Sequence, residues 1–136
     1  MEISEIEERF SRIPGSEGEL NEMLFAKAFG WSYPLTGAGY HHFHDLSRDH
    51  GKTDFTGNAH AAFTLARQVI EKAKFEIAIA ESGRAEVRMS GYSETWQRCF
   101  YDVARTGPTL ALAVSSCALE VMKRMSQNAE TVRMAG

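Results

Sequence analysis

The chain has 136 residues, with 15 basic and 18 acidic side chains and a formal net charge of −3 at neutral pH. Hydrophobic residues make up 43% and charged residues 24%, an ordinary globular composition that excludes a disordered or fibrous chain. The negative balance argues against a protein whose whole surface binds nucleic acid or anionic membranes. A chain of this length buries roughly two-thirds of its unfolded surface, so we expect one domain over residues 1–136.

The first 30 residues carry the signals of two short helices. Ser4 followed by Glu7 is a capping pattern that starts a helix, and Pro14 ends it. A second stripe of apolar residues at helical spacing ends at Gly30, which suits a left-handed helix cap. We therefore predict an N-terminal helical pair in residues 1–30.

Residues 31–54 show neither the helical nor the strand period. Pro34, Gly37 and Gly51 interrupt this segment, which holds four of the five histidines of the chain. The segment is therefore predicted to be a long loop. A loop of this length in a small domain is unusual, and we expect it to be functional or mobile.

Residues 55–126 are predicted to form the core. A helix starts at Thr56 and ends near Lys74, after which the apolar period changes from helical spacing to strict alternation. The alternation predicts an antiparallel hairpin that turns at Gly83, and a third strand follows through residues 98–104.

The last predicted helix is unusually apolar. It opens at Pro108, and no residue from Thr106 to Leu119 is charged, so most of its circumference must be covered. Its apolar strip also favours a homodimer contact. Residues 127–136 are predicted to be a frayed tail.

These elements predict an α+β fold in the order α-α-loop-α-β-β-β-α. A small three-stranded antiparallel meander needs cover on its apolar side, and the last helix needs neighbours all round. We expect α/β/α layers, with helices on both sides of the sheet. Two layers and a dimer contact would satisfy the same requirements.

Several stretches resemble a family of small phage and prophage proteins of unknown function, described as an ABA-sandwich domain. The stretches are the Phe29-Gly30-Trp31 helix end, Asp54-Phe55-Thr56-Gly57 with the alanine-rich helix after it, the hairpin residues Gly83-Arg84-Ala85-Glu86-Val87, and the run from Ala104 to Ala113. The resemblance implies α/β/α layering and a phage or prophage origin. It supplies no catalytic or binding residues.

The cysteines and the termini bear on the compartment. Cys99 and Cys117 lie in apolar surroundings without a metal-type spacing, so we expect small buried residues in a reducing compartment and leave a disulfide between them open. The acidic N-terminus lacks a signal peptide, and the longest uncharged run is shorter than the about 20 residues that span a bilayer. We expect no membrane partner and a cytoplasmic protein, in the bacterial host if it is phage-derived.

The densest group of chemically versatile side chains lies in the predicted loop. Imidazoles and carboxylates are the ligands of zinc and other divalent first-row metals, and histidine-rich tracts often bind them. The candidate ligands are His41, His42, His44, Asp45, Asp49 and His50. Their spacing fixes no coordination geometry, so we favour a polar loop without a cofactor and keep the metal site as an alternative.

A second group combines positive charge with aromatic rings on the predicted sheet, with Phe100 nearby. Its members are Arg84, Arg88, Tyr92, Trp96 and Arg98. Tryptophan, tyrosine and arginine dominate protein interfaces, and the same mixture binds single-stranded nucleic acid. A solvated strand face whose arginines pair with Glu76 and Asp102 is the plainer interpretation.

The sequence therefore predicts a non-catalytic accessory or interaction protein that contacts an unknown protein partner and forms a homodimer. One alternative is a divalent-metal-binding, hydrolytic domain that uses the histidines. The other is a weak single-strand binder, although the negative net charge disfavours nucleic acid as a partner.

Overall fold

The computed structural model describes residues 3–10, 12, 18–48, 51–93 and 99–135. Its elements, in chain order, are α1 (Ile3–Phe10), α2 (Gly18–Phe29), α3 (Gly37–Arg48), α4 (Ala59–Val69), β1 (Lys74–Ile79), β2 (Ala85–Tyr92), β3 (Phe100–Gly107) and α5 (Leu110–Ala135). The α+β class is confirmed, and so is the three-stranded antiparallel meander, with the order β1-β2-β3.

One additional helix distinguishes the structure from the predicted order. Helix α3 occupies the middle of the segment predicted to be a loop, so that prediction is wrong. Phe43 is the buried side chain on the helix, and its ring lies 5.2 Å from that of Phe25 on α2. Gly39 takes the place of an apolar residue one turn earlier, because a Cβ there would lie 2.8 Å from the Trp31 ring. Because residue 39 is a glycine, the segment lacks the regularly spaced apolar side chains from which a helix is predicted.

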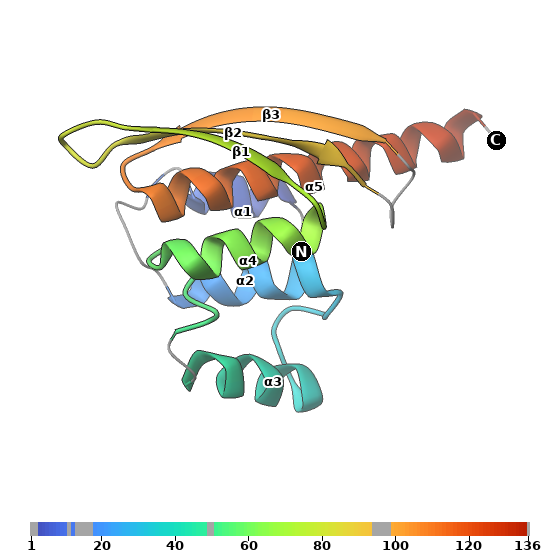
Figure 1. Ribbon diagram of the computed structural model, residues 1–136. Coiled ribbons are helices and arrows are strands. Elements are labelled where there is room, and N and C mark those ends of the chain that lie inside the picture. Colours follow the sequence, from blue (N-terminus) through green and yellow to red (C-terminus); the bar gives the residue numbers. More distant parts are fainter. Residues whose placement is uncertain (1–2, 11, 13–17, 49–50, 94–98, 136) are drawn as a thin grey trace.

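Helix α5 extends further than predicted. It continues to Ala135, through the segment expected to be a frayed tail. The sequence from Leu110 to Ala135 contains neither glycine nor proline and is rich in alanine, methionine and other good helix formers, so nothing in it stops the helix. The final turns extend beyond the end of the sheet (Figure 1).

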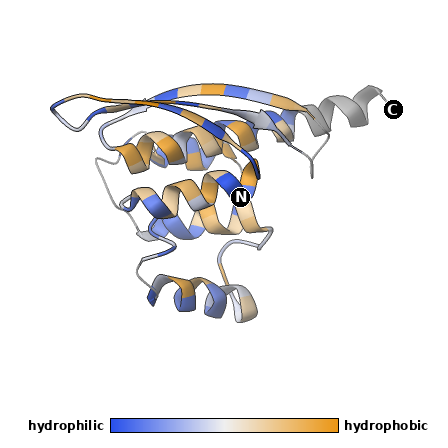
Figure 2. Cartoon of the chain, in the orientation of Figure 1, coloured by the Kyte–Doolittle hydropathy of each residue, from blue (hydrophilic) through white to orange (hydrophobic). Residues whose placement is uncertain are grey.

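The helices cover one face of the sheet rather than both. Buried residues alternate with more exposed ones along β3, and Figure 2 shows hydrophobic and hydrophilic residues following one another along the strands. Figure 1 places all the helices on the same side of the sheet, with α5 next to it and α3 farthest away. The expected α/β/α layering therefore differs from the structure. Helix α5 obtains its cover from β2 and β3 on one side and from α1 and α4 on the others, so its apolar surface requires no further helix layer.

A buried polar cluster connects the helices below the sheet. Asn21 on α2 is 5% exposed, and its Oδ1 accepts hydrogen bonds from both the backbone N–H and the hydroxyl of Thr56, at 3.0 Å each. Its Nδ2 donates to Asp54 Oδ1 at 3.0 Å. The hydroxyl of Ser115 on α5 donates to the carbonyl of Phe55 at 2.6 Å. The segment from Asp54 to Thr56 is thus bonded to α2 and α5 at once.

The Asn21 cluster predicts a large loss of stability on truncation. Replacing Asn21 with Ala removes the acceptor for two donors of the buried Thr56, and we expect the free energy of unfolding to fall by about 2–3 kcal/mol. Urea unfolding followed by circular dichroism measures this change. The exposed Lys27→Ala substitution on the same helix is the matched control and should have little effect. Equal losses in the two variants would contradict the structural role of Asn21.

Both cysteines are free thiols, so no disulfide joins them. Cys117 is fully buried on α5, and its Sγ lies 3.4 Å from the backbone carbonyl of Val87. Burial raises the pKa of the Cys117 thiol to about 11, because the thiolate would lose its hydration.

This environment predicts that Cys117 is inert in the native protein. In a Cys99→Ser variant, the remaining thiol should react with a maleimide only as fast as the protein unfolds, because the reactive thiolate is scarce and covered. The labelling rate with and without urea, read by mass spectrometry, checks this expectation. Rapid labelling without urea would contradict it.

Candidate interaction surface

The face of the sheet that points away from the helices is open across all three strands. We call it the outer face, and its exposed strand residues are Lys74, Glu76, Ala78, Glu86, Arg88, Tyr92, Phe100, Asp102, Ala104 and Thr106. Among the described residues no helix covers it. Helices pack against one face of the sheet and leave the outer face exposed. The outer face is therefore a preformed surface that a partner can bind.

An ion pair fixes the centre of the outer face. Arg88 binds the carboxylate of Asp102 through two hydrogen bonds, of 2.8 and 2.5 Å. The hydrogen bonds from Arg88 lower the pKa of the Asp102 carboxyl, and the same pairing raises the pKa of Arg88. Arg84 also lies on this face, and its Nη2 donates to Thr106 Oγ1 at 3.4 Å. Both predicted arginines that the structure describes are thus held against neighbouring strands.

Two aromatic rings lie at one end of the outer face. Tyr92 is directly opposite Phe100 in the pairing of β2 with β3, and the two residues are 48% and 65% exposed. The sequence placed Phe100 near the predicted contact residues, on the polar side of the third strand, but did not show that it lies directly opposite Tyr92. The other two predicted contact residues, Trp96 and Arg98, lie outside the described residues.

Strand β1 presents a second exposed apolar feature. Its side chains Ile77 and Ile79 are on the helix-facing side of the sheet, yet they are 44% and 59% exposed. Phe75 on the same strand packs against Phe63 of α4, with ring centroids 4.8 Å apart. The cover that α4 provides therefore ends before Ile77.

The predicted metal ligands that the structure describes lie on α3 and differ in their contacts. His42 lies near the Phe25 ring, with centroids 5.8 Å apart, whereas His44 lies against Tyr40 at 4.2 Å. Asp45 is 4.0 Å from Arg48, one turn along the helix.

The histidine nearest to a carboxylate is His44. Its Nε2 lies 3.9 Å from Glu22 Oε1 on α2, and no hydrogen bond to it exists among the described residues. His41, like His44, contacts the Tyr40 ring. The predicted ligands Asp49 and His50 lie outside the described residues, and within the described part no three metal-binding side chains come together.

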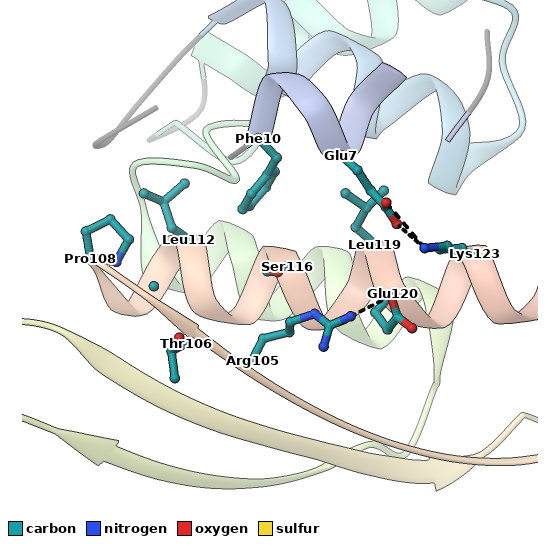
Figure 3. A pocket seen from close by; sticks show the side chains of 11 residues that line it. Glu7, Phe10, Arg105, Thr106, Pro108, Leu112, Ser116, Leu119, Glu120 and Lys123 are labelled. Atoms are coloured by element: carbon teal, nitrogen blue, oxygen red, sulfur yellow. Dashed lines mark hydrogen bonds and ion pairs between the residues drawn. The ribbon is translucent and has the colours of Figure 1, made fainter. Parts of the chain in front are cut away.

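The sequence did not reveal a hollow of about 440 Å³ between α1, α5 and the end of β3 (Figure 3). Phe10, Leu112 and Leu119 form its apolar wall. Its cations are paired at the rim, with Arg105 2.6 Å from a Glu120 oxygen and Lys123 3.2 Å from a Glu7 oxygen. Each of these cations therefore has a carboxylate partner.

Searches against protein-family models, curated protein sequences and solved structures each found no match. In the part of the chain that the structure describes, no helix has the length and apolar character needed to cross a membrane.

The Arg88–Asp102 pair predicts acid sensitivity. Since the folded pKa of Asp102 is lowered, its stabilising effect is complete above the ordinary value of 3.8 and is lost as the pH falls through the folded pKa. An Asp102→Asn variant should therefore lose less stability than the parent between about pH 5 and about pH 2. Urea unfolding across this range measures the difference.

A double-mutant cycle provides the control for this prediction. In an Arg88→Gln background the lowering of the Asp102 pKa is largely removed, so Asp102→Asn should change the acid dependence less than it does in the parent. The same change in both backgrounds would show that Arg88 is not the cause.

Proposed function

We propose that this chain is a small, non-catalytic interaction protein that binds a protein partner through the outer face of its sheet. The observation that carries the proposal is the exposed pair Tyr92 and Phe100 beside the fixed ion pair of Arg88 and Asp102. Aromatic residues and arginine contribute most of the binding energy in protein interfaces. Two large rings on a polar strand face gain little for the isolated fold, since about half or more of each side chain remains exposed to water.

The arrangement of charge supports a protein rather than a nucleic acid as the partner. The outer face has as many acidic as basic side chains, so it has no surplus of positive charge. They are Glu76, Glu86 and Asp102 against Lys74, Arg84 and Arg88. Binding of a nucleic acid backbone depends on such a surplus. A mixed face with aromatic anchors is instead typical of protein interfaces.

The resemblance to the phage ABA-sandwich family supports a proposal on the origin of the protein and the compartment in which it acts. We propose a phage or prophage origin and action in the bacterial cytoplasm. The Asp54-Phe55-Thr56-Gly57 stretch, on which the resemblance partly depends, belongs to the buried cluster around Asn21. The role of this motif is therefore structural. The partner is therefore to be sought through the outer face rather than through this motif.

A metal site on α3 stays an alternative prediction. His44 and Glu22 supply two suitable ligand atoms, 3.9 Å apart. Metal analysis of purified protein separates this alternative from the proposal, because it predicts stoichiometric metal that falls in a His42→Ala, His44→Ala variant.

The proposal predicts that the outer face determines which proteins the chain captures. A tagged parent should retain a host protein in stoichiometric amount, and Tyr92→Ser with Phe100→Ser should weaken that binding by about tenfold or more. Quantitative mass spectrometry identifies the captured protein, and calorimetry with the purified pair measures the affinity.

Tyr40 offers a matched control, because it is 45% exposed but lies on α3, away from the sheet. Tyr40→Ser should leave the affinity unchanged. If the double variant retained the same proteins with the same affinity as the parent, the outer face would not be the binding surface.

A further inference from the structure

The two edges of the sheet are protected differently. At the β3 edge, Arg124 of α5 donates to the backbone carbonyl of Asp102 at 3.1 Å, and the Arg105 side chain donates to the carbonyl of Ala104 at 3.1 Å. These bonds occupy carbonyls that a further strand would need. Among the described residues, no side chain bonds to the backbone of β1, so its edge is open. Proteins usually block exposed strand edges, because free edges pair with other chains.

The hydrogen-bond pattern between β1 and β2 shows which residues of β1 direct their backbone groups toward this open edge. The N–H of Ala80 donates to the carbonyl of Arg84 at 2.9 Å, at the end of the β1–β2 pairing. Backbone groups alternate in direction along an antiparallel strand. Phe75, Ile77 and Ile79 therefore direct their N–H and C=O groups away from β2, toward the open edge.

The same three residues carry the large apolar side chains of β1. Ile77 and Ile79 lie on the helix-facing side of the sheet at 44% and 59% exposure, beyond the contact of Phe75 with Phe63. A partner strand at this edge would satisfy the backbone groups and cover these side chains together. Its own side chains on that face must be apolar.

The sequence of β1 is complementary to itself in one register. Antiparallel pairing about a two-fold axis at Ile77 places Ile77 opposite its own copy and Phe75 opposite Ile79 of the second copy. On the outer face, Glu76 then lies opposite Ala78. A register shifted to centre on Glu76 would place two carboxylates opposite each other, which is destabilising.

We propose that a second copy of this chain binds at the β1 edge, in antiparallel register centred on Ile77. The two sheets become one sheet of six strands, and the two outer faces lie on the same side of it. The interface involves neither Tyr92 nor Phe100, so this inference stands apart from the proposed binding of a partner.

Sedimentation equilibrium of the full chain at tens of micromolar tests the proposal. The parent should be a dimer, and Ile77→Lys should be a monomer, because two ammonium groups would then meet at the axis. Circular dichroism confirms that the variant is folded, as expected for a side chain already 44% exposed. Phe100→Lys is the matched control on the other face and should remain a dimer.

Disulfide trapping tests the register even if Ile77→Lys fails to fold. In a Cys99→Ser background, Ile77→Cys should form a covalent dimer on mild oxidation, because paired Cα atoms lie about 5.5 Å apart in a ladder. Ile79→Cys places its two copies about four residues apart along the pairing, beyond disulfide reach, and should react far more slowly.

Three results would overturn the proposal: a monomeric parent, a dimer that Phe100→Lys but not Ile77→Lys dissociates, or equal cross-linking at residues 77 and 79. A dimeric parent that captures no partner would contradict only the proposed function. A monomeric parent that captures a partner through the outer face would contradict only the dimer.

Discussion

Burial of the first half of α5 is the constraint on which the rest of the structure depends. Residues 111–115 are buried in succession, all round the helix, so this helix needs neighbours on every side. The sheet supplies one neighbour, and α4 and α1 supply the others. The hydrogen bond from Ser115 to Phe55 joins α5 to the segment that also binds Asn21 of α2. Because α5 obtains all its cover in this way, no helix is required above the sheet, and the outer face stays open.

The outer face and the β1 edge are both open because the helices pack on one side of the sheet only and do not extend over Ile77 and Ile79. The two surfaces differ in chemistry. The outer face is polar, with an ion pair and two aromatic rings, and suits a partner that approaches a preformed surface. The β1 edge offers backbone groups and isoleucines, and suits another strand. A dimer joined at β1 would present two outer faces on one side, so a bivalent partner would bind more tightly than a monovalent one.

Part of the candidate surface followed from the alternation of residues. The strand period placed Arg84 and Arg88 on the polar side of the sheet, where the structure has them, whereas Tyr92 was expected in a connection and lies at the end of β2. The same period placed Ile77 and Ile79 on the apolar side but could not show that α4 ends before them. The segment that holds four of the five histidines was predicted to be a loop, because Gly39, which lies close to Trp31, occupies an apolar position in the period of α3.

The sequence by itself determined the α+β class, the meander and the cover required by the last helix, because local periodicity and charge-free runs report directly which faces must leave water. Only the tertiary structure decided which side of the sheet the helices occupy, which edge the arginines of β3 and α5 block, and that α3 is a helix. These features depend on contacts between residues far apart in the chain, such as Arg124 with Asp102 and Gly39 with Trp31. No local pattern encodes such contacts.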